Sequence, residues 1–266
     1  GKTSNMKKEF YITLLAIFAS VGNLFSQSML ISGGNDHGVA LCNKGQIFAW
    51  GYNGGNRLGL KTPYDAQEIV TTPQLVNIPA GLTFSQVSAG SGSAQIALAC
   101  TGVVYAWGEN KVGTAGQPLS KEIVTSPMPV TCGEATDHGF DIDGVSPGSY
   151  LGGVKMVGGT TSAGMALLDD GRAVIWGGNG RYQAGENYPL IKTESPNPIY
   201  VRDKSGKILE NIIHISGGDN NMLLVVGDSK DASVGVVYSL GNVNGRGVGA
   251  DKDPSTFYAA PVEIID

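Results

Sequence analysis

Residues 45–59 read GQIFAWGYNGGNRLG, and they decide the fold because the chain repeats them. The pattern returns at residues 102–116 (GVVYAWGENKVGTAG), 171–185 (GRAVIWGGNGRYQAG) and, in a more divergent form, 235–249 (GVVYSLGNVNGRGVG). The centres of the copies, Trp50, Trp107, Trp176 and Leu240, follow one another at intervals of about 60 residues, which predicts tandem structural units joined by loops of different length.

Each copy keeps glycine at fixed places around its centre: five residues before it, one after it and nine after it. The structural repeat positions are Gly45, Trp50, Gly51 and Gly59; Gly102, Trp107, Gly108 and Gly116; Gly171, Trp176, Gly177 and Gly185; and Gly235, Leu240, Gly241 and Gly249. In the first three copies an asparagine follows the centre by three residues (Asn53, Asn110, Asn179), and we expect its side chain to tie a turn to its own backbone.

Short apolar runs with small residues precede each centre, as residues 31–34 and 39–41 do in the first copy. A proline beside an apolar residue follows each centre, at Pro73, Pro129, Pro198 and Pro261. These short runs, broken by glycine turns, show almost no helical periodicity and predict several strands per unit. The tryptophan of a unit must be buried against a neighbouring unit, because one unit is too small to form a core alone.

The units resemble the repeat of the regulator of chromosome condensation (RCC) family. Residues 31–60 match its pattern almost throughout, including His37 and the closing Leu58-Gly59. The resemblance covers about residues 29–266. The second and third units lack the histidine, and the fourth has Leu240 in place of tryptophan, which marks it as a degenerate unit.

The resemblance implies an all-β fold, a β-propeller that commonly has seven blades, of which about four are present here. At about 51° per blade, four units cover little more than half a circle, so we expect an incomplete, open arc and a longer intact protein. The expected parts are an N-terminal extension and signal peptide at 1–28, repeats at about 29–80, 81–131, 153–201 and 211–266, and an insertion at about 131–153.

The N-terminus predicts export. Two lysines follow Met6, and then come an apolar run at 11–19 and small residues at 20–28. This is the layout of a secretory signal peptide, with cleavage after Ser26 or Ser28. The run is shorter than the ~20 residues of a spanning helix, so we expect no membrane span after cleavage, and a bacterial cell envelope or exterior location. A first strand or a membrane anchor is the alternative.

The composition disfavours nucleic acid as a partner, because the net charge is −5 and no basic patch is present. Glycine, at 40 of 266 residues, is about twice its usual frequency, which suits tight turns and close strand packing. Three cysteines are an odd number, so we expect small unpaired residues at Cys42, Cys100 and Cys132, with pairing of two of them left open.

No catalytic, metal-binding or cofactor-binding set is predicted. Residues 144–148 match Gly-x-Ser-x-Gly, but no helix pattern follows the serine. Residues 141–144 begin like a calcium loop that lacks its closing acidic residue. The histidines His37, His138 and His214 show no paired spacing on one element. We therefore predict a protein that is not an enzyme.

Export and scaffold repeats together favour a non-enzymatic secreted scaffold that binds an unknown protein partner through loops on one propeller face. The candidate contact segments are 61–72, 117–126, 131–153 and 187–197, which we expect on one rim, and simple connectors are the alternative. Tyr64, Tyr150 and Tyr188 are candidate anchors, because tyrosine offers contact area and a hydrogen bond at little entropic cost. The RCC family includes secreted bacterial propellers, and its best-known activity, guanine-nucleotide exchange on a small GTPase, is one alternative. A docking or adhesion module of a larger secreted enzyme is another.

Overall fold

The computed structural model describes residues 30–61, 68–90, 92, 94–132, 146, 148–180, 183, 194–203, 205–228, 235–241 and 260–261. Over these residues the chain is all-β, with strands β1 to β16 and one short 3-10 turn, η1 (Gly54–Asn56). No helix in this described part is long and apolar enough to cross a membrane. The predicted fold class is confirmed.

The strands form four antiparallel sheets of four strands, and each sheet uses one copy of the sequence repeat. The first sheet contains β1 (Leu30–Gly33), β2 (His37–Leu41), β3 (Ile47–Tyr52) and β4 (Ile69–Leu75), and the second contains β5 (Phe84–Ser88), β6 (Ala94–Ala99), β7 (Val104–Glu109) and β8 (Ile123–Pro129). The third contains β9 (Val154–Gly159), β10 (Ala163–Leu168), β11 (Ala173–Gly178) and β12 (Glu194–Tyr200), and the fourth contains β13 (Ile212–Gly217), β14 (Asn221–Gly227), β15 (Gly235–Gly241) and β16 (Ala260–Pro261). Strands consecutive in the chain are neighbours in the sheet, so each sheet is a simple meander.

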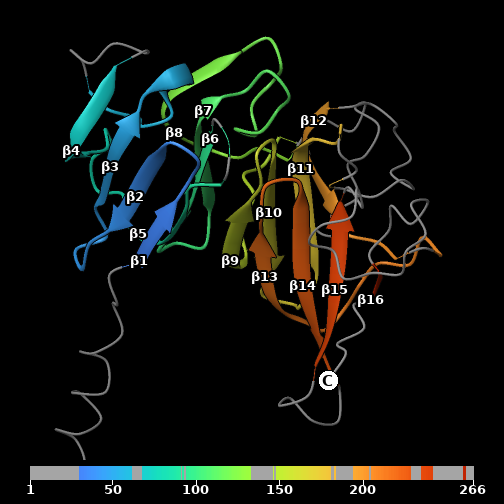
Figure 1. The fold of residues 1–266 in the computed structure, drawn as a ribbon. Coiled ribbons are helices and arrows are strands. Elements are labelled where there is room, and N and C mark those ends of the chain that lie inside the picture. Colours follow the sequence, from blue (N-terminus) through green and yellow to red (C-terminus); the bar gives the residue numbers. More distant parts are fainter. Residues whose placement is uncertain are drawn as a thin grey trace, which may run out of the picture.

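The sheets stand side by side (Figure 1), and the contacts between strands of neighbouring sheets are made by the first two strands of each sheet. Strand β5 packs against β1 and β2, β9 against β5 and β6, and β13 against β9 and β10. Because these contacts gather at one edge of each sheet, the sheets are blades that fan out from a common side. Among the described residues, no substantial contact joins the fourth blade to the first, and the four blades form an open arc.

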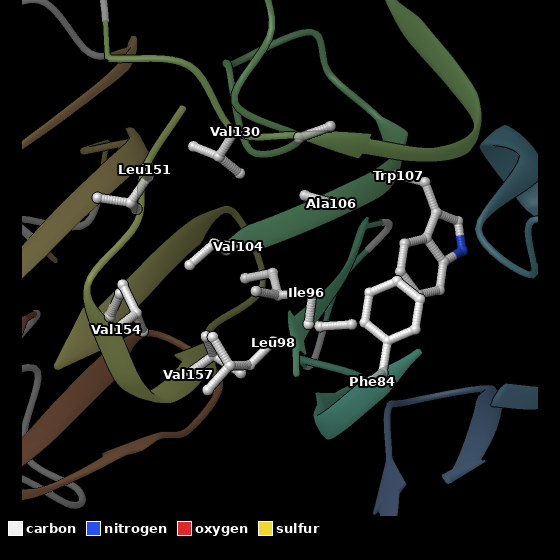
Figure 2. Close-up of a cluster of buried hydrophobic side chains, with 14 of the residues drawn as sticks. Phe84, Ile96, Leu98, Val104, Ala106, Trp107, Val130, Leu151, Val154 and Val157 are labelled. Atoms are coloured by element: carbon white, nitrogen blue, oxygen red, sulfur yellow. The ribbon is translucent and has the colours of Figure 1, made fainter. Parts of the chain in front are cut away.

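The hydrophobic core lies between the blades. One cluster of buried side chains runs through the first three blades and a second joins the third blade to the fourth. Figure 2 shows Trp107 beside Phe84 at the edge of the first cluster that faces the first blade, while Val154 and Val157 lie toward the third. Each interface between blades therefore supplies the burial that a single blade lacks.

The outer strand of each of the first three blades bulges at the same place, opposite the centre of the repeat. In the first blade Ala49 pairs with Gln74 and Gly51 with Val70, so the outer strand carries two more residues than its partner. The second and third blades have the same irregularity. Pro73 lies in this bulge of the first outer strand, where its missing N–H removes a donor from an exposed sheet edge.

Antiparallel order places successive connections at opposite ends of the blades. We define the loop face by residues 34–36, 160–162 and 218–220, which follow first strands, and by 53–61 and 110–122, which follow third strands. The hairpin face carries residues 42–46, 100–103 and 169–172 and the described linkers between blades. The described ends of the candidate segment at 131–153, residues 131–132 and 148–153, lie between a fourth strand and the next first strand, so these ends do not share the predicted rim with the loop at 117–122. The middle of the segment lies outside the described residues.

Candidate partner-binding face

The tryptophans of the repeat pack between neighbouring blades and contact the loop-face segment of the preceding blade. The indole of Trp107 lies on Gly59 of the first blade, where an added Cβ would fall 2.6 Å from its nitrogen. The indole of Trp176 donates a hydrogen bond from Nε1 to the carbonyl oxygen of Thr114 in the second blade, at 3.0 Å. Both rings are buried. Each tryptophan thus contacts the loop of the preceding blade, Trp107 at the glycine that closes the repeat and Trp176 at Thr114, two residues before that glycine.

The glycine after each centre lets the third strand pass close to its neighbour. Gly51, Gly108 and Gly177 have φ of 102°, 106° and 97°, a backbone region that is strained for residues with a Cβ. At Gly177 a Cβ would lie 2.6 Å from the carbonyl oxygen of Ser162, which also accepts the hydroxyl of Thr114 at 2.7 Å. Glycine at this position therefore allows both the positive φ in β11 and the close contact of β11 with the turn at Ser162.

The asparagine of the repeat orders the loop that follows. Asn110 is buried; its Nδ2 donates to the carbonyl oxygens of Gln117 (2.9 Å), Pro118 (3.2 Å) and Lys121 (2.9 Å). Its Oδ1 accepts the backbone N–H of Ala115 at 3.0 Å. In the first blade Asn53 accepts the N–H of Leu58 in the same way, at 3.2 Å. One side chain thus determines the path of the loop on the loop face.

Gln117 is a residue that the sequence analysis missed. Its side chain is buried, and Nε2 donates to the carbonyl oxygens of Gly116 (3.0 Å) and Pro129 (2.8 Å), which ties the loop to the outer strand. The other copies have no glutamine at this position, so the repeat pattern gave no signal for it.

The loop held by Asn110 presents apolar and charged side chains to solvent. Leu119 and Ile123 are exposed, and Lys111 forms an ion pair with Glu109 at 2.6 Å. Lys121 is exposed beside them and its Nζ lies 2.8 Å from Met128 Sδ. An ordered loop with exposed apolar and charged side chains at and beside it is a candidate contact surface on the loop face.

Of the three candidate tyrosine anchors, Tyr64 and Tyr188 lie outside the described residues. Tyr150 is 59% exposed and forms an isolated β-bridge with Thr131. Its neighbour Leu151 accepts the N–H of Val104 at the start of β7, which places Tyr150 at the hairpin face. Tyr150 therefore does not lie with the loop at 110–122.

The described residues form no site for the other candidate chemistries. Cys42, Cys100 and Cys132 are all free, and burial raises the pKa of the Cys132 thiol to about 11. Within the described ranges no three His, Cys, Asp or Glu side chains are placed to hold a metal ion. His214 lies exposed on β13. His138, residues 141–144 and most of the Gly-x-Ser-x-Gly match lie outside the described residues.

His37, the histidine of the repeat pattern, is buried at the loop face of the first blade. Its ring lies under Gly34, where an added Cβ would fall 2.2 Å from Cε1, and its Nδ1 is 3.4 Å from Oδ1 of Asp36. The same carboxylate pairs with Arg57 at 2.5 Å. Burial lowers the pKa of His37, opposed in part by the hydrogen bond with Asp36. The ring thus acts as a neutral packing group.

This pKa shift predicts that the protein loses stability in mild acid. The unfolded chain binds a proton at His37 near pH 6.5, whereas the folded chain binds it only at lower pH. The stabilisation is therefore complete above about pH 6.5 and falls as the pH drops through the folded pKa, by at most about 1.4 kcal/mol per pH unit. Urea unfolding at pH 5.5 and 7.5 measures it. In His37→Asn the difference in unfolding free energy between pH 5.5 and pH 7.5 should be smaller than in the wild type. An unchanged difference would show that other groups cause the loss of stability.

The four blades and their repeated tryptophan interfaces define a β-propeller built of glycine-rich tandem units. A family model described as the regulator of chromosome condensation (RCC1) repeat matches residues 44–94. The crystal structure of yeast RCC1 (Prp20) bound to Kap60 gives a TM-score of 0.65 at 18% identity, over 90% of this chain and 49% of that one. Human WBSCR16 gives 0.64 at 19% identity, over 88% and 51%. The chain is thus similar to the RCC1 repeat over residues 44–94 and shares the fold of these solved propellers.

Curated relatives share the repeats over most of this chain. The probable E3 ubiquitin-protein ligase HERC6 of Homo sapiens is 26% identical over 240 residues, which are 89% of this chain and 20% of HERC6. Protein pim1 of Schizosaccharomyces pombe is 29% identical over 232 residues, 81% of this chain and 37% of pim1. The chain thus spans about half of the solved propellers and a smaller share of these relatives. All of them are eukaryotic proteins.

Proposed function

We propose that the chain is an exported, non-catalytic scaffold that binds another protein through its loop face. The observation that supports this proposal most directly is the set of hydrogen bonds made by Asn110. This buried side chain holds an exposed loop in one conformation. A loop ordered in advance loses less conformational entropy when a partner binds. The positions shared by the repeats are used for packing and loop order, which leaves the loop side chains to select the partner.

Similar proteins point in the same direction. Yeast Prp20, at 21% identity, is described by its binding to Gsp1p and histones, and the same protein was also solved with Kap60 bound. One propeller of this shape thus has protein partners. The basic and apolar N-terminus favours export, and we propose the bacterial cell envelope or exterior as the location of the chain. An exported chain would bind a partner other than Kap60, Gsp1p or histones.

Site-specific photo-crosslinking in the producing cell tests the proposal. A photoreactive residue at Leu119 or Lys111 probes the loop face, and one at Thr101 or Asn43 probes the hairpin face as a matched control. We expect one recurrent protein adduct from the loop-face positions and several-fold less of it from the controls. Recovery of that adduct from the envelope or medium, on a chain that lacks residues 1–28, would support export.

A further variant tests the role of the ordered loop. Asn110→Ala removes the donors and the acceptor that hold residues 115–121, and we expect it to reduce the Leu119 adduct while the blades remain folded. Equal adduct yields from both faces, or yields that do not respond to Asn110→Ala, would contradict binding through this loop.

A further inference from the structure

Three buried polar side chains gather where the first and second blades meet, at the end toward the loop face. They belong to His37, Gln95 and Trp107, which are 6%, 0% and 1% exposed. Among the described residues, no hydrogen-bond partner meets Nε2 of His37, either amide atom of Gln95 or Nε1 of Trp107. No other buried side-chain nitrogen or oxygen in the described part of the chain is left in this state. Buried polar groups are nearly always hydrogen-bonded, so this cluster requires a partner.

The strand register places Gln95 and Trp107 in the interface with the first blade. The two residues lie directly opposite each other in the pair formed by β6 and β7, so their side chains share one side of the second blade. That side faces the first blade, because the indole of Trp107 lies on Gly59. Figure 2 shows the indole nitrogen on the side of the ring that faces the first blade.

His37 reaches the same interface from the first blade. It shares a side of β2 with Val39, which is buried in the core cluster between the blades, since alternate residues of a strand point the same way. Ser32, opposite Val39 in β1, accepts the N–H of Ala89 in the second blade at 3.0 Å. The backbone of Ala89 also lies near enough to influence the pKa of the His37 ring, but among the described residues no group meets Nε2 in hydrogen-bond geometry.

The other two interfaces fill the same repeat positions differently. These positions hold Ala94, Gly164 and Trp176 between the second and third blades, and Ala163, Met222 and Leu240 between the third and fourth. At the second interface the indole N–H is used directly, in the hydrogen bond from Trp176 to Thr114. At the third interface all three side chains belong to one apolar cluster. The polar set is therefore particular to the first interface and is not required by the repeat.

The hydrogen-bonding groups of this set are complementary to a small neutral molecule. Nε1 of Trp107 and Nε2 of Gln95 are donors, and Oε1 of Gln95 is an acceptor. Nδ1 of His37 lies 3.4 Å from Oδ1 of Asp36, and a carboxylate only accepts, so we assign the ring proton to Nδ1 and leave Nε2 as an acceptor. A guest must therefore both accept and donate. It must also be small, because packed blades enclose all three residues.

We propose that ordered water is bound between the first and second blades by these three side chains. Water accepts the N–H of Trp107, donates to Nε2 of His37 and makes a third hydrogen bond with the amide of Gln95. About three hydrogen bonds are typical of a buried water molecule, which fits this set. The water bridges the first and second blades where the second and third are joined by the hydrogen bond from Trp176 to Thr114.

Nuclear magnetic resonance of the indole N–H groups tests this on the full chain. The chain has three tryptophans, whose signals are assigned with Trp50→Phe and Trp176→Phe. We expect the indole N–H of Trp107 to show a cross-peak with water that has opposite signs in NOE and ROE spectra, the mark of a bound water and not of proton exchange. Trp176 is the internal control and should show none, because Thr114 accepts its N–H. A Trp107 indole without this cross-peak would overturn the proposal.

A double variant tests which side chains hold the water. His37→Ala with Gln95→Met installs the pair that the third interface uses, Ala163 and Met222, and should weaken the Trp107 cross-peak several-fold. Gln46→Met makes the same change at an exposed position of the hairpin face and should leave the cross-peak unchanged. An unchanged Trp176 signal shows that each variant is folded. A cross-peak that keeps its full strength in the folded double variant would contradict binding by these side chains.

A crystal structure of the unchanged chain gives a second measurement that needs no variant. We expect a water oxygen within about 3.2 Å of Nε1 of Trp107 and of an atom of His37 or Gln95. Direct hydrogen bonds among the three side chains, with no water between them, would overturn the proposal.

Discussion

The Trp176→Ala chain is expected to lose about 3–5 kcal/mol of unfolding free energy, the typical cost of truncating a buried aromatic side chain. The indole is 1% exposed, its Nε1 donates to the Thr114 carbonyl oxygen, and it covers Gly164, where an added Cβ would fall 2.3 Å from the ring. Alanine leaves a cavity between the second and third blades and an unpaired carbonyl. Urea unfolding followed by circular dichroism measures the loss.

Trp50→Ala is the matched control, because it removes the same side chain at the same place in the repeat. Trp50 lies half-buried on the side of the first blade away from the second, where no described blade covers it, so less apolar surface returns to water when it is removed. We expect less than half of the loss seen for Trp176→Ala. Equal losses in the two variants would show that burial between blades is not the source of the stability.

The contrast between these two tryptophans shows what the sequence can and cannot predict. The repeat predicts the strands, the glycine turns and the need of each tryptophan for a neighbouring blade. It treats Trp50, Trp107 and Trp176 as equivalent, and they differ in burial because the first has no blade before it in the arc. Position within the arc is a property of the whole assembly, which a local pattern does not contain.

The loops show the same limit more strongly. Variable length after a fixed glycine suggested that four segments share one rim. This prediction is wrong for the described ends of 131–153, because segments that follow third and fourth strands leave the blade at opposite ends. Counting strands within each unit would have separated them. The hydrogen bonds of Gln117 could not have been predicted in this way, because they depend on a loop path found in one blade.

Gly177→Ala is the second change for which we expect a large effect, about 2–5 kcal/mol of unfolding free energy. At φ of 97° a residue with a Cβ is strained by about 1–3 kcal/mol. The new methyl group would also lie 2.6 Å from the carbonyl oxygen of Ser162, and relief of such a clash in a packed interface costs about 1–3 kcal/mol more. Thermal and urea unfolding measure the sum.

Two other glycines separate these contributions. Gly206→Ala has a comparable φ of 82° with nothing within 4 Å of the added Cβ, so it should show the backbone strain alone. Gly180→Ala meets open space at ordinary φ and should change stability by a few tenths of a kcal/mol at most. We expect the losses to rank Gly177, Gly206, Gly180. If Gly177→Ala costs no more than Gly206→Ala, the close approach of the third strand to the turn at Ser162 does not constrain this position, and the glycine of the Trp-Gly pair is there for its φ alone.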